Sequence, residues 1–236
     1  MSVMYVRDEN GKPIPIPGGG GGNGKTGKYP DWSHLTWYVV GDSLTARNGD
    51  AKRYYDFVQE KTGINVIVEG HGGTGYKAGI TSGITFLERM KRSLKAENEE
   101  GALKVDIVTI FGSGNDVEHT DDQAYDDIFP TLSWLANYRP GLRVIVAPPV
   151  AWQAYDKRKN EAWLRYCTRL KECTLACDFR YLSDTYDCPP FNPRFSGHLE
   201  KFFAPGVDGI HPNDAGHEAL APYFYNALLQ ELAFKL

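Results

Sequence analysis

The stretch WYVVGDSLTARNGD, residues 37–50, joins an apolar run to a Gly-Asp-Ser turn. The apolar residues favour a strand, and the polar, glycine-containing sequence after them favours a turn. Ser43 therefore lies where a predicted strand ends. A serine there can cap a following helix, because its hydroxyl accepts a hydrogen bond from a free helical N–H. It can also be a nucleophile exposed above a sheet, and the rest of the chain must decide.

Strand-like and helix-like segments alternate from residue 35 onward. The predicted strands are residues 35–40, 64–69, 105–111, 142–148 and, more weakly, 177–182. The predicted helices are residues 50–61, 83–97, 121–137, 158–175 and 214–235. Strands that are apolar at consecutive positions are buried on both faces, which is typical of parallel sheets. Right-handed crossovers between them predict an α/β protein with a three-layer α/β/α domain.

The composition excludes some partners. The chain has 236 residues, 42% hydrophobic and 24% charged, which suits one α/β domain with or without an appendage. A net charge of −4 and the lack of a Lys/Arg cluster argue against a nucleic-acid partner. No apolar run approaches the roughly 20 residues of a membrane helix, so we expect no membrane partner. The N-terminus lacks a secretory signal pattern, which favours a cytoplasmic or virion-associated protein.

Residues 1–30 differ from the rest, and we expect an N-terminal extension there and the main domain over residues 31–236. The segment MYVRDENGKPIPIP, residues 4–17, predicts two short extended pieces around an Asn-Gly turn. GGGGGNGKTGK, residues 18–28, is typical of a flexible linker. It lacks the preceding strand and following helix of a phosphate-binding loop, so it does not predict a nucleotide site.

The cysteines do not predict a metal site. Four of them share one short window, without a C-x-x-C pair; they are Cys167, Cys173, Cys177 and Cys188. Zinc sites normally use closer pairs, so these residues are interpreted as structural thiols. We expect neither a metal nor another cofactor.

Chemically useful residues follow the predicted strands. The first strand ends in Gly-Asp-Ser-Leu (41–44), the second in EGHGGTG (69–75) and the third in GSGND (112–116). VDGIHPN (207–213) precedes the last helix. In open parallel sheets, ligands bind beyond the carboxyl ends of the strands. A serine, a glycine-rich turn, an asparagine and an Asp-x-x-His are therefore expected on one rim.

This ordered set resembles the SGNH hydrolase superfamily, the GDSL esterases and lipases. The family has a serine in G-D-S, a glycine after the second strand, an asparagine in G-x-N-D and a histidine in D-x-x-H. The resemblance spans residues 35–236. It implies a flavodoxin-like fold with a five-stranded parallel sheet in the order 2-1-3-4-5.

The resemblance also implies a serine esterase mechanism. A serine hydroxyl needs a base that takes its proton as it attacks, and His211 is the candidate. Asp208 can hold the other ring nitrogen of His211 and stabilise the imidazolium. The implied oxyanion donors are the backbone N–H groups of Ser43 and Gly73 and the side-chain amide of Asn115.

Alternatives remain at several of these positions. A small shift of alignment would make Gly72 or Gly75 the oxyanion glycine. Ser113 stands where the family has glycine, so the main chain can bend differently there. Asp42 is expected to fix the turn, and Asp116 to cap a helix. Asp208-Gly209 can also be a plain turn, with His211 a surface residue.

The segments expected around the site favour a sugar substrate. Residues 148–160 and 184–206 mix aromatic with charged and amide side chains, which suits stacking on a sugar ring better than burying an acyl chain. His71 can contact substrate, or be an exposed polar residue. The other candidate substrate contacts, each of which can instead be a loop residue packed over the domain, are Trp152, Tyr155, Phe191 and Arg194.

The sequence thus predicts an esterase that hydrolyses short acyl esters through an acyl-enzyme. The first-choice substrate is an O-acetyl group on a carbohydrate. The expected partner is a small-molecule or polysaccharide ester. Alternatives are a lipase or thioesterase, or a non-catalytic glycan-binding phage tail component. YVRDENGKPIPIP resembles the opening of tail-associated proteins from phages and prophages of Gram-positive bacteria. Residues 1–30 are accordingly expected to attach the domain to a larger assembly.

Overall fold

The computed structural model describes most of the chain. The described residues are 5–7, 13–15, 29–47, 49, 51–77, 84–95, 103–117, 121–150, 157–183, 202–203 and 211–233. The chain divides into two units, Met1–Pro30 and Asp31–Leu236.

The first unit contains two short strands. β1 (Tyr5–Arg7) pairs antiparallel with β2 (Pro13–Pro15), and these are the two extended pieces that the sequence predicted. The Asn-Gly turn between them and the predicted linker at 18–28 lie outside the described residues. The attachment role expected for this unit stays a prediction.

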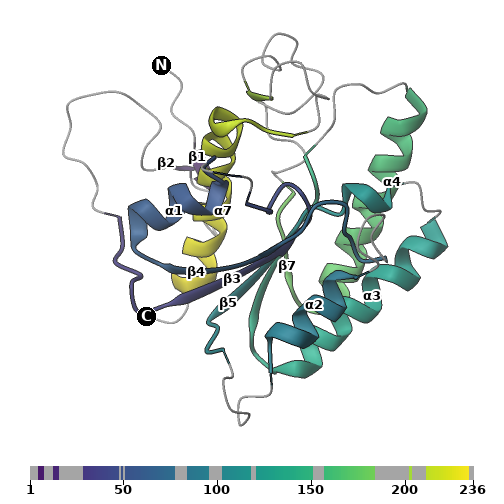
Figure 1. Ribbon diagram of the computed structural model, residues 1–236, viewed down its shortest axis with the longest axis horizontal. Helices are drawn as coiled ribbons and strands as arrows, with labels where there is room; N and C mark the ends of the chain where they lie inside the picture. The colour runs from purple at the N-terminus through teal and green to yellow at the C-terminus, as the bar shows by residue number, and fades with distance from the viewer. Residues whose placement is uncertain are drawn as a thin grey trace. The chain divides into compact units, whose positions relative to one another are not determined.

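The second unit is built on a parallel sheet of five strands. They are β3 (Thr36–Gly41), β4 (Asn65–Gly70), β5 (Ile107–Phe111), β6 (Arg143–Ala147) and β7 (Arg180–Tyr181). Their spatial order is β4-β3-β5-β6-β7, with every neighbouring pair parallel (Figure 1). Counted within this unit, the order is 2-1-3-4-5, so the predicted fold is confirmed.

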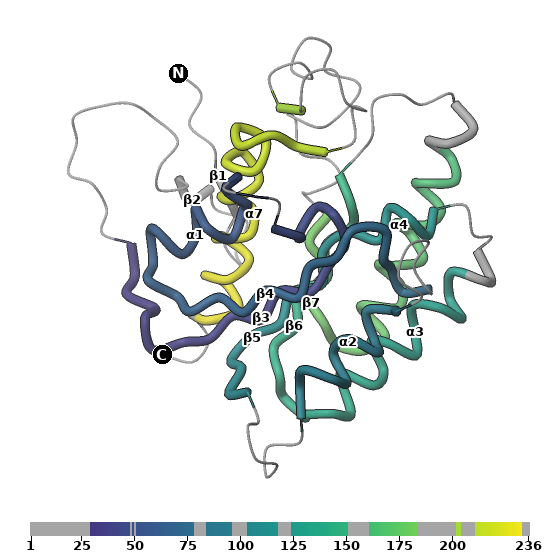
Figure 2. Tube along the Cα trace, viewed as in Figure 1, coloured from purple at the N-terminus to yellow at the C-terminus, as the bar shows by residue number. Residues whose placement is uncertain are grey.

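Helices cover both faces of this sheet. α1 (Tyr54–Thr62) packs against α7 (Asp214–Ala233) on one face. α2 (Phe86–Ser93), α3 (Asp121–Tyr138) and α4 (Lys157–Ala176) cover the other, where α3 packs against both of its neighbours (Figure 2). This is the three-layer arrangement that the alternating sequence pattern predicts.

The sheet carries a core on each face because its central strands are apolar at consecutive positions. Every residue of β5 is buried. On the α1–α7 face, the Phe224 ring stacks on Tyr54 with centroids 4.1 Å apart and meets Phe111 edge-on at 5.1 Å. On the other face, Tyr38 and Ile110 are buried among side chains of α2, α3 and α4.

The two helices that differ most from prediction start later than expected, for a local reason. The pattern predicted helices from residues 50 and 83, but α1 begins at Tyr54 and α2 at Phe86. Each start is fixed by an acidic residue in the first turn. Asp56 Oδ2 accepts the Arg53 N–H at 2.8 Å, and Glu88 Oε2 accepts the Thr85 N–H at 2.8 Å. At α2 the Glu88 N–H also donates to Thr85 Oγ1 at 3.2 Å, which completes a capping box. Periodicity does not reveal such bonds.

The described cysteines pack in and beside the core. Cys167 and Cys173 are buried, and Cys177 is partly buried. Cys188 lies outside the described residues. Within the described ranges, no group of three or more His, Cys, Asp or Glu side chains could hold a metal ion. Nor does any helix there have the length and apolar character needed to cross a membrane.

Candidate active site

The turn that carries Ser43 is tightly held. Asp42 Oδ1 accepts the Leu44 N–H at 2.9 Å, and the Asp42 carbonyl accepts the N–H groups of Thr45 and Ala46 at 3.1 and 2.9 Å. Asp42 therefore fixes the turn, as expected. The next helix begins only at Tyr54, with Arg53 as its N-cap residue, so Ser43 is not a helix cap. Its half-buried side chain lies at the carboxyl end of β3.

Ser43 and His211 contact each other at the edge of the sheet where the strands have their carboxyl ends. His211 Nε2 lies 2.8 Å from Ser43 Oγ, although the two residues are 168 positions apart. His211 lies three residues before the start of α7, where Asn213 Oδ1 accepts the Gly216 N–H at 2.9 Å. Asn213 Nδ2 also donates to the Phe203 carbonyl at 3.0 Å, which ties this segment down on a second side. Asp208 lies outside the described residues.

The turn after β4 packs against Ser43. The His71 N–H donates to the Gly41 carbonyl at 3.0 Å, and Thr74 Oγ1 donates to the His71 carbonyl at 2.7 Å. A methyl group placed on Gly72 would lie 3.7 Å from the Ser43 Cβ. Gly73 has a φ of 72°, a left-handed conformation that favours glycine. Gly72 therefore lies beside the serine, and Gly73 follows it in the turn.

Asn115 joins the same rim. Its Nδ2 donates to the Thr74 carbonyl at 2.9 Å, which holds the amide against the glycine turn. The side chain is only partly buried, like those of Ser43 and His211. Three sequence-predicted residues from the ends of different segments are thus brought together.

The third block turns at Ser113 through a backbone conformation that favours glycine. Ser113 has φ 74° and ψ 18°, the left-handed conformation that glycine adopts most easily. Its N–H donates to Asp42 Oδ2 at 2.8 Å, and its hydroxyl donates to the Gly112 carbonyl. These bonds hold Ser113 in a conformation that costs a non-glycine residue roughly 1–2 kcal/mol. The expectation of a different bend from that of the family stays a prediction.

Asp116 has a different role from the helix cap that the sequence suggested. It lies inside a short 3₁₀ turn, η1 (Gly114–Asp116), and its Oδ2 accepts the Tyr76 N–H at 2.7 Å. Burial raises the pKa of Asp116 to about 7, although the bond from Tyr76 opposes the shift. Burial likewise raises the pKa of Asp42 to about 6, against the opposing N–H donors of Leu44, Gly114 and Ser113.

His71 lies on the exposed edge of this rim. Its side chain is 54% exposed, and its Nε2 lies 3.5 Å from Glu69 Oε1. Arg89 Nη1 lies 3.6 Å from the same carboxylate oxygen, and Ser93 Oγ donates to Glu69 Oε2 at 2.9 Å. The rim beside the glycine turn is therefore polar and charged. The other candidate substrate contacts, Trp152, Tyr155, Phe191 and Arg194, lie outside the described residues.

Sequence reasoning missed a buried pair behind the nucleophile turn. Arg53 Nη1 donates to His217 Nε2 at 2.8 Å, and Arg53 Nε donates to the Ala46 carbonyl at 2.9 Å. Burial, together with the Arg53 charge, lowers the pKa of His217 to about 3. The pair links the Ser43 turn to α7, the helix that follows His211. No motif could have revealed it, since the two residues are 164 positions apart.

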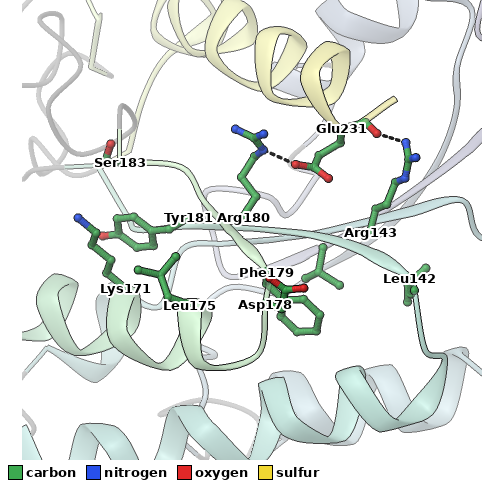
Figure 3. A pocket seen from close by; sticks show the side chains of 12 residues that line it. Leu142, Arg143, Lys171, Leu175, Asp178, Phe179, Arg180, Tyr181, Ser183 and Glu231 are labelled. Carbon is green, nitrogen blue, oxygen red and sulfur yellow. Dashed lines mark hydrogen bonds and ion pairs between the residues drawn. The ribbon is translucent and has the colours of Figure 1, made fainter. Parts of the chain in front are cut away.

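A cavity of about 610 Å³ lies along the β7 edge of the sheet, and Figure 3 shows its lining. Arg180 pairs with the Glu231 carboxylate, and Arg143 donates to the Glu231 carbonyl (Figure 3). None of the described residues that the sequence predicted for the site lines it. The cavity is therefore separate from the Ser43–His211 site.

Comparison with known families and structures agrees with the fold. Residues 39–219 match the model of the GDSL-like Lipase/Acylhydrolase family. No curated protein sequence matches the chain.

Several solved structures share the fold at low sequence identity. A protein from Lactobacillus plantarum has a TM-score of 0.64 and 18% identity, covering 83% of this chain and 97% of its own. A lipase/acylhydrolase from Enterococcus faecalis has a TM-score of 0.58 and 19% identity, covering 82% and 95%. An acetyl xylan esterase from Geobacillus stearothermophilus has a TM-score of 0.56 and 20% identity, covering 89% and 98%.

Proposed function

The chain belongs to the GDSL-like lipase/acylhydrolase family and is a carboxylic ester hydrolase, and we propose that it removes short acyl groups, in the first place O-acetyl groups from a carbohydrate. The proposed catalytic residues are Ser43, His211 and Asp208. The observation that carries the proposal is the 2.8 Å contact between Ser43 Oγ and His211 Nε2.

This contact supplies a nucleophile and its base. His211 Nε2 takes the hydroxyl proton as Ser43 Oγ attacks the acyl carbon. The tetrahedral intermediate collapses to an acyl-enzyme, and the leaving alcohol takes the proton back from His211. Water then attacks the acyl-enzyme with His211 again as base, which releases the carboxylic acid and restores Ser43.

The intermediate needs donors for its negatively charged oxygen. We assign the backbone N–H groups of Ser43 and Gly73 and the Asn115 amide to this role. A side-chain amide has two N–H groups. One from Asn115 donates to the Thr74 carbonyl, so the second can serve the oxyanion while the first fixes the amide in place. A preorganised donor of this kind is worth about 3–4 kcal/mol of transition-state stabilisation.

Asp208 is proposed as the carboxylate that orients His211. The support is its place in Asp-x-x-His, three residues before the base. A carboxylate bonded to the Nδ1–H of His211 would hold Nε2 toward Ser43 and stabilise the imidazolium.

The proposal of an acetylated carbohydrate rests on the rim and on one structural neighbour. The exposed His71 and the partly exposed Glu69 carboxylate make the described rim polar. A hydroxyl-rich substrate can hydrogen-bond such groups, whereas a long acyl chain requires an apolar wall. The neighbour from Geobacillus stearothermophilus is an acetyl xylan esterase, which makes acetylated xylan a reasonable first substrate to test.

For residues 1–30 we propose a role in attaching the esterase domain to a larger assembly, such as a phage tail. Support comes from their forming a unit of their own and from the resemblance of YVRDENGKPIPIP to tail-associated openings. A chain that begins at residue 31 should keep the kcat of the full chain but lose binding to the isolated assembly. Loss of kcat in the shortened chain would contradict a purely attaching role.

The test of the proposed function is hydrolysis of p-nitrophenyl acetate and acetylated xylan by the full chain, with and without a serine-directed phosphonate. We expect hydrolysis that the phosphonate abolishes, with the label on Ser43. Release of acetate from xylan that persists after full labelling of Ser43 would contradict the assignment.

A further inference from the structure

We propose that two buried carboxylates, Asp42 and Asp116, are positioning residues that hold the three motif turns at the distances the oxyanion donors require. This inference rests on the proposed function of Ser43, Gly73 and Asn115. Asp42 is 2% exposed and Asp116 is 4% exposed, and neither is needed as a nucleophile or base.

Asp42 joins the first turn to the third. Its Oδ1 accepts the Leu44 N–H at 2.9 Å, next to the nucleophile. Its Oδ2 accepts the Ser113 N–H at 2.8 Å and the Gly114 N–H at 3.3 Å, directly before Asn115. Both carboxylate oxygens are therefore acceptors, and they fix the separation of Ser43 and Asn115.

Asp116 joins the third turn to the second. Its Oδ2 accepts the Tyr76 N–H at 2.7 Å, at the end of the glycine turn. The neighbouring Asn115 amide bonds the Thr74 carbonyl at 2.9 Å, so two adjacent side chains hold the same turn. The Tyr166 hydroxyl also donates to Asp116 Oδ2 at 3.4 Å.

Each carboxylate packs against a glycine, in space that any larger residue's side chain would fill. A methyl group on Gly112 would lie 2.5 Å from the Asp42 carboxyl carbon, and one on Gly75 would lie 2.2 Å from Asp116 Oδ2. The glycines of the second and third motifs are thus matched to the two carboxylates. Gly75, which the sequence left open as an oxyanion donor, thus also has a packing role.

The chain offers a matched control at the opposite end of the sheet. Asp106 Oδ2 accepts the Thr36 N–H at 2.8 Å, which joins β3 to β5 at their amino ends. This bond has the same chemistry as that of Asp116 but lies away from the oxyanion turns. Removing it should lower stability without changing the chemical step.

The test uses steady-state kinetics on p-nitrophenyl acetate, with the folded fraction of each variant measured by denaturation. We expect Asp42→Asn and Asp116→Ala to lower kcat about 100-fold with KM within about twofold, because misplaced oxyanion donors act in the transition state. Asp116→Asn should restore most of the kcat, because one amide oxygen can still accept the Tyr76 N–H. Asp42→Asn should not keep the wild-type kcat, because Asp42 accepts hydrogen bonds with both oxygens and asparagine has only one acceptor oxygen. Asp106→Ala should keep the wild-type kcat.

The inference is overturned if Asp42→Asn and Asp116→Ala retain the wild-type kcat, or if Asp106→Ala lowers it equally. It is also overturned if Asp116→Asn is no better than Asp116→Ala. Should Asp42→Asn not fold, the Asp116 pair and the Asp106 control decide by themselves. Ser43→Ala in the same series distinguishes the proposed function from this inference. Activity in that variant would contradict Ser43 as the nucleophile, but it would not contradict the positioning role of Asp42 and Asp116.

Discussion

Lowering the pH should destabilise this protein through His217, a residue outside the proposed triad. In the folded chain, His217 Nε2 accepts from Arg53 Nη1 at 2.8 Å. Nδ1 then carries the proton, and it is buried with no hydrogen-bond partner among the described residues. A second proton would set an N–H against the Arg53 donor and place two positive charges together. His217 therefore stays neutral in the fold, while the unfolded chain can protonate it.

The size of the effect follows from the two pKa values. Burial and Arg53 lower the pKa of His217 from 6.5 to about 3. A depressed pKa gives stability that is present above the unfolded value and is lost as the pH falls toward the folded value. At pH 5 only the unfolded chain is largely protonated, so this residue alone should cost about 2 kcal/mol relative to pH 7.5. The full cost, reached near pH 3, is about 5 kcal/mol.

Urea denaturation of the wild type and His217→Gln at pH 7.5 and pH 5.0 isolates this residue. The glutamine oxygen can still accept from Arg53 but cannot be protonated. All other titrating groups are common to both chains. Their contributions therefore cancel in the double difference, which is the change in unfolding free energy between the two pH values in the wild type minus the same change in the variant. Between the two pH values the wild type should lose about 2 kcal/mol more of its unfolding free energy than the variant.

His34→Gln is the matched control, because it makes the same substitution at an exposed histidine. A double difference for His217→Gln below about 0.5 kcal/mol, or of opposite sign, would refute the reasoning. It would mean that His217 is protonated in the fold or is not buried beside Arg53.

Three further changes test the site. Ser43→Ala should lower kcat by several orders of magnitude with an unchanged urea midpoint, and more than a few per cent of residual activity would place the nucleophile elsewhere. Gly112→Ala should destabilise the fold by more than about 3 kcal/mol, because φ is 123° and the new methyl would meet the Asp42 carboxylate; a smaller loss in urea denaturation would contradict that packing. Across p-nitrophenyl esters, kcat/KM should fall from acetate to butyrate and be very low for octanoate, at about 1–3 kcal/mol per methylene, whereas an octanoate preference would favour a lipase or thioesterase.

Local sequence determined the sheet and the order of the motifs. The runs at residues 37–40 and 144–147 are apolar at consecutive positions, and residues 107–111 are apolar except for Thr109, which is typical of strands buried on both faces. Alternating helices then require parallel strands, whose carboxyl ends share one rim. Ser43, Asn115 and His211 could therefore be assigned to that rim from the sequence and from the resemblance that their motifs carry.

The tertiary structure alone decided how the rim is held together. Ser113 adopts a glycine-like φ of 74° because Asp42, from another strand end, binds its N–H. Arg53 finds His217 because α1 and α7 pack side by side. These contacts join residues that are far apart along the chain, and their energies depend on burial and on bond geometry. Local propensity carries no information on burial or on the geometry of these bonds. From the sequence alone, the same residues are therefore indistinguishable from ordinary turn and helix positions.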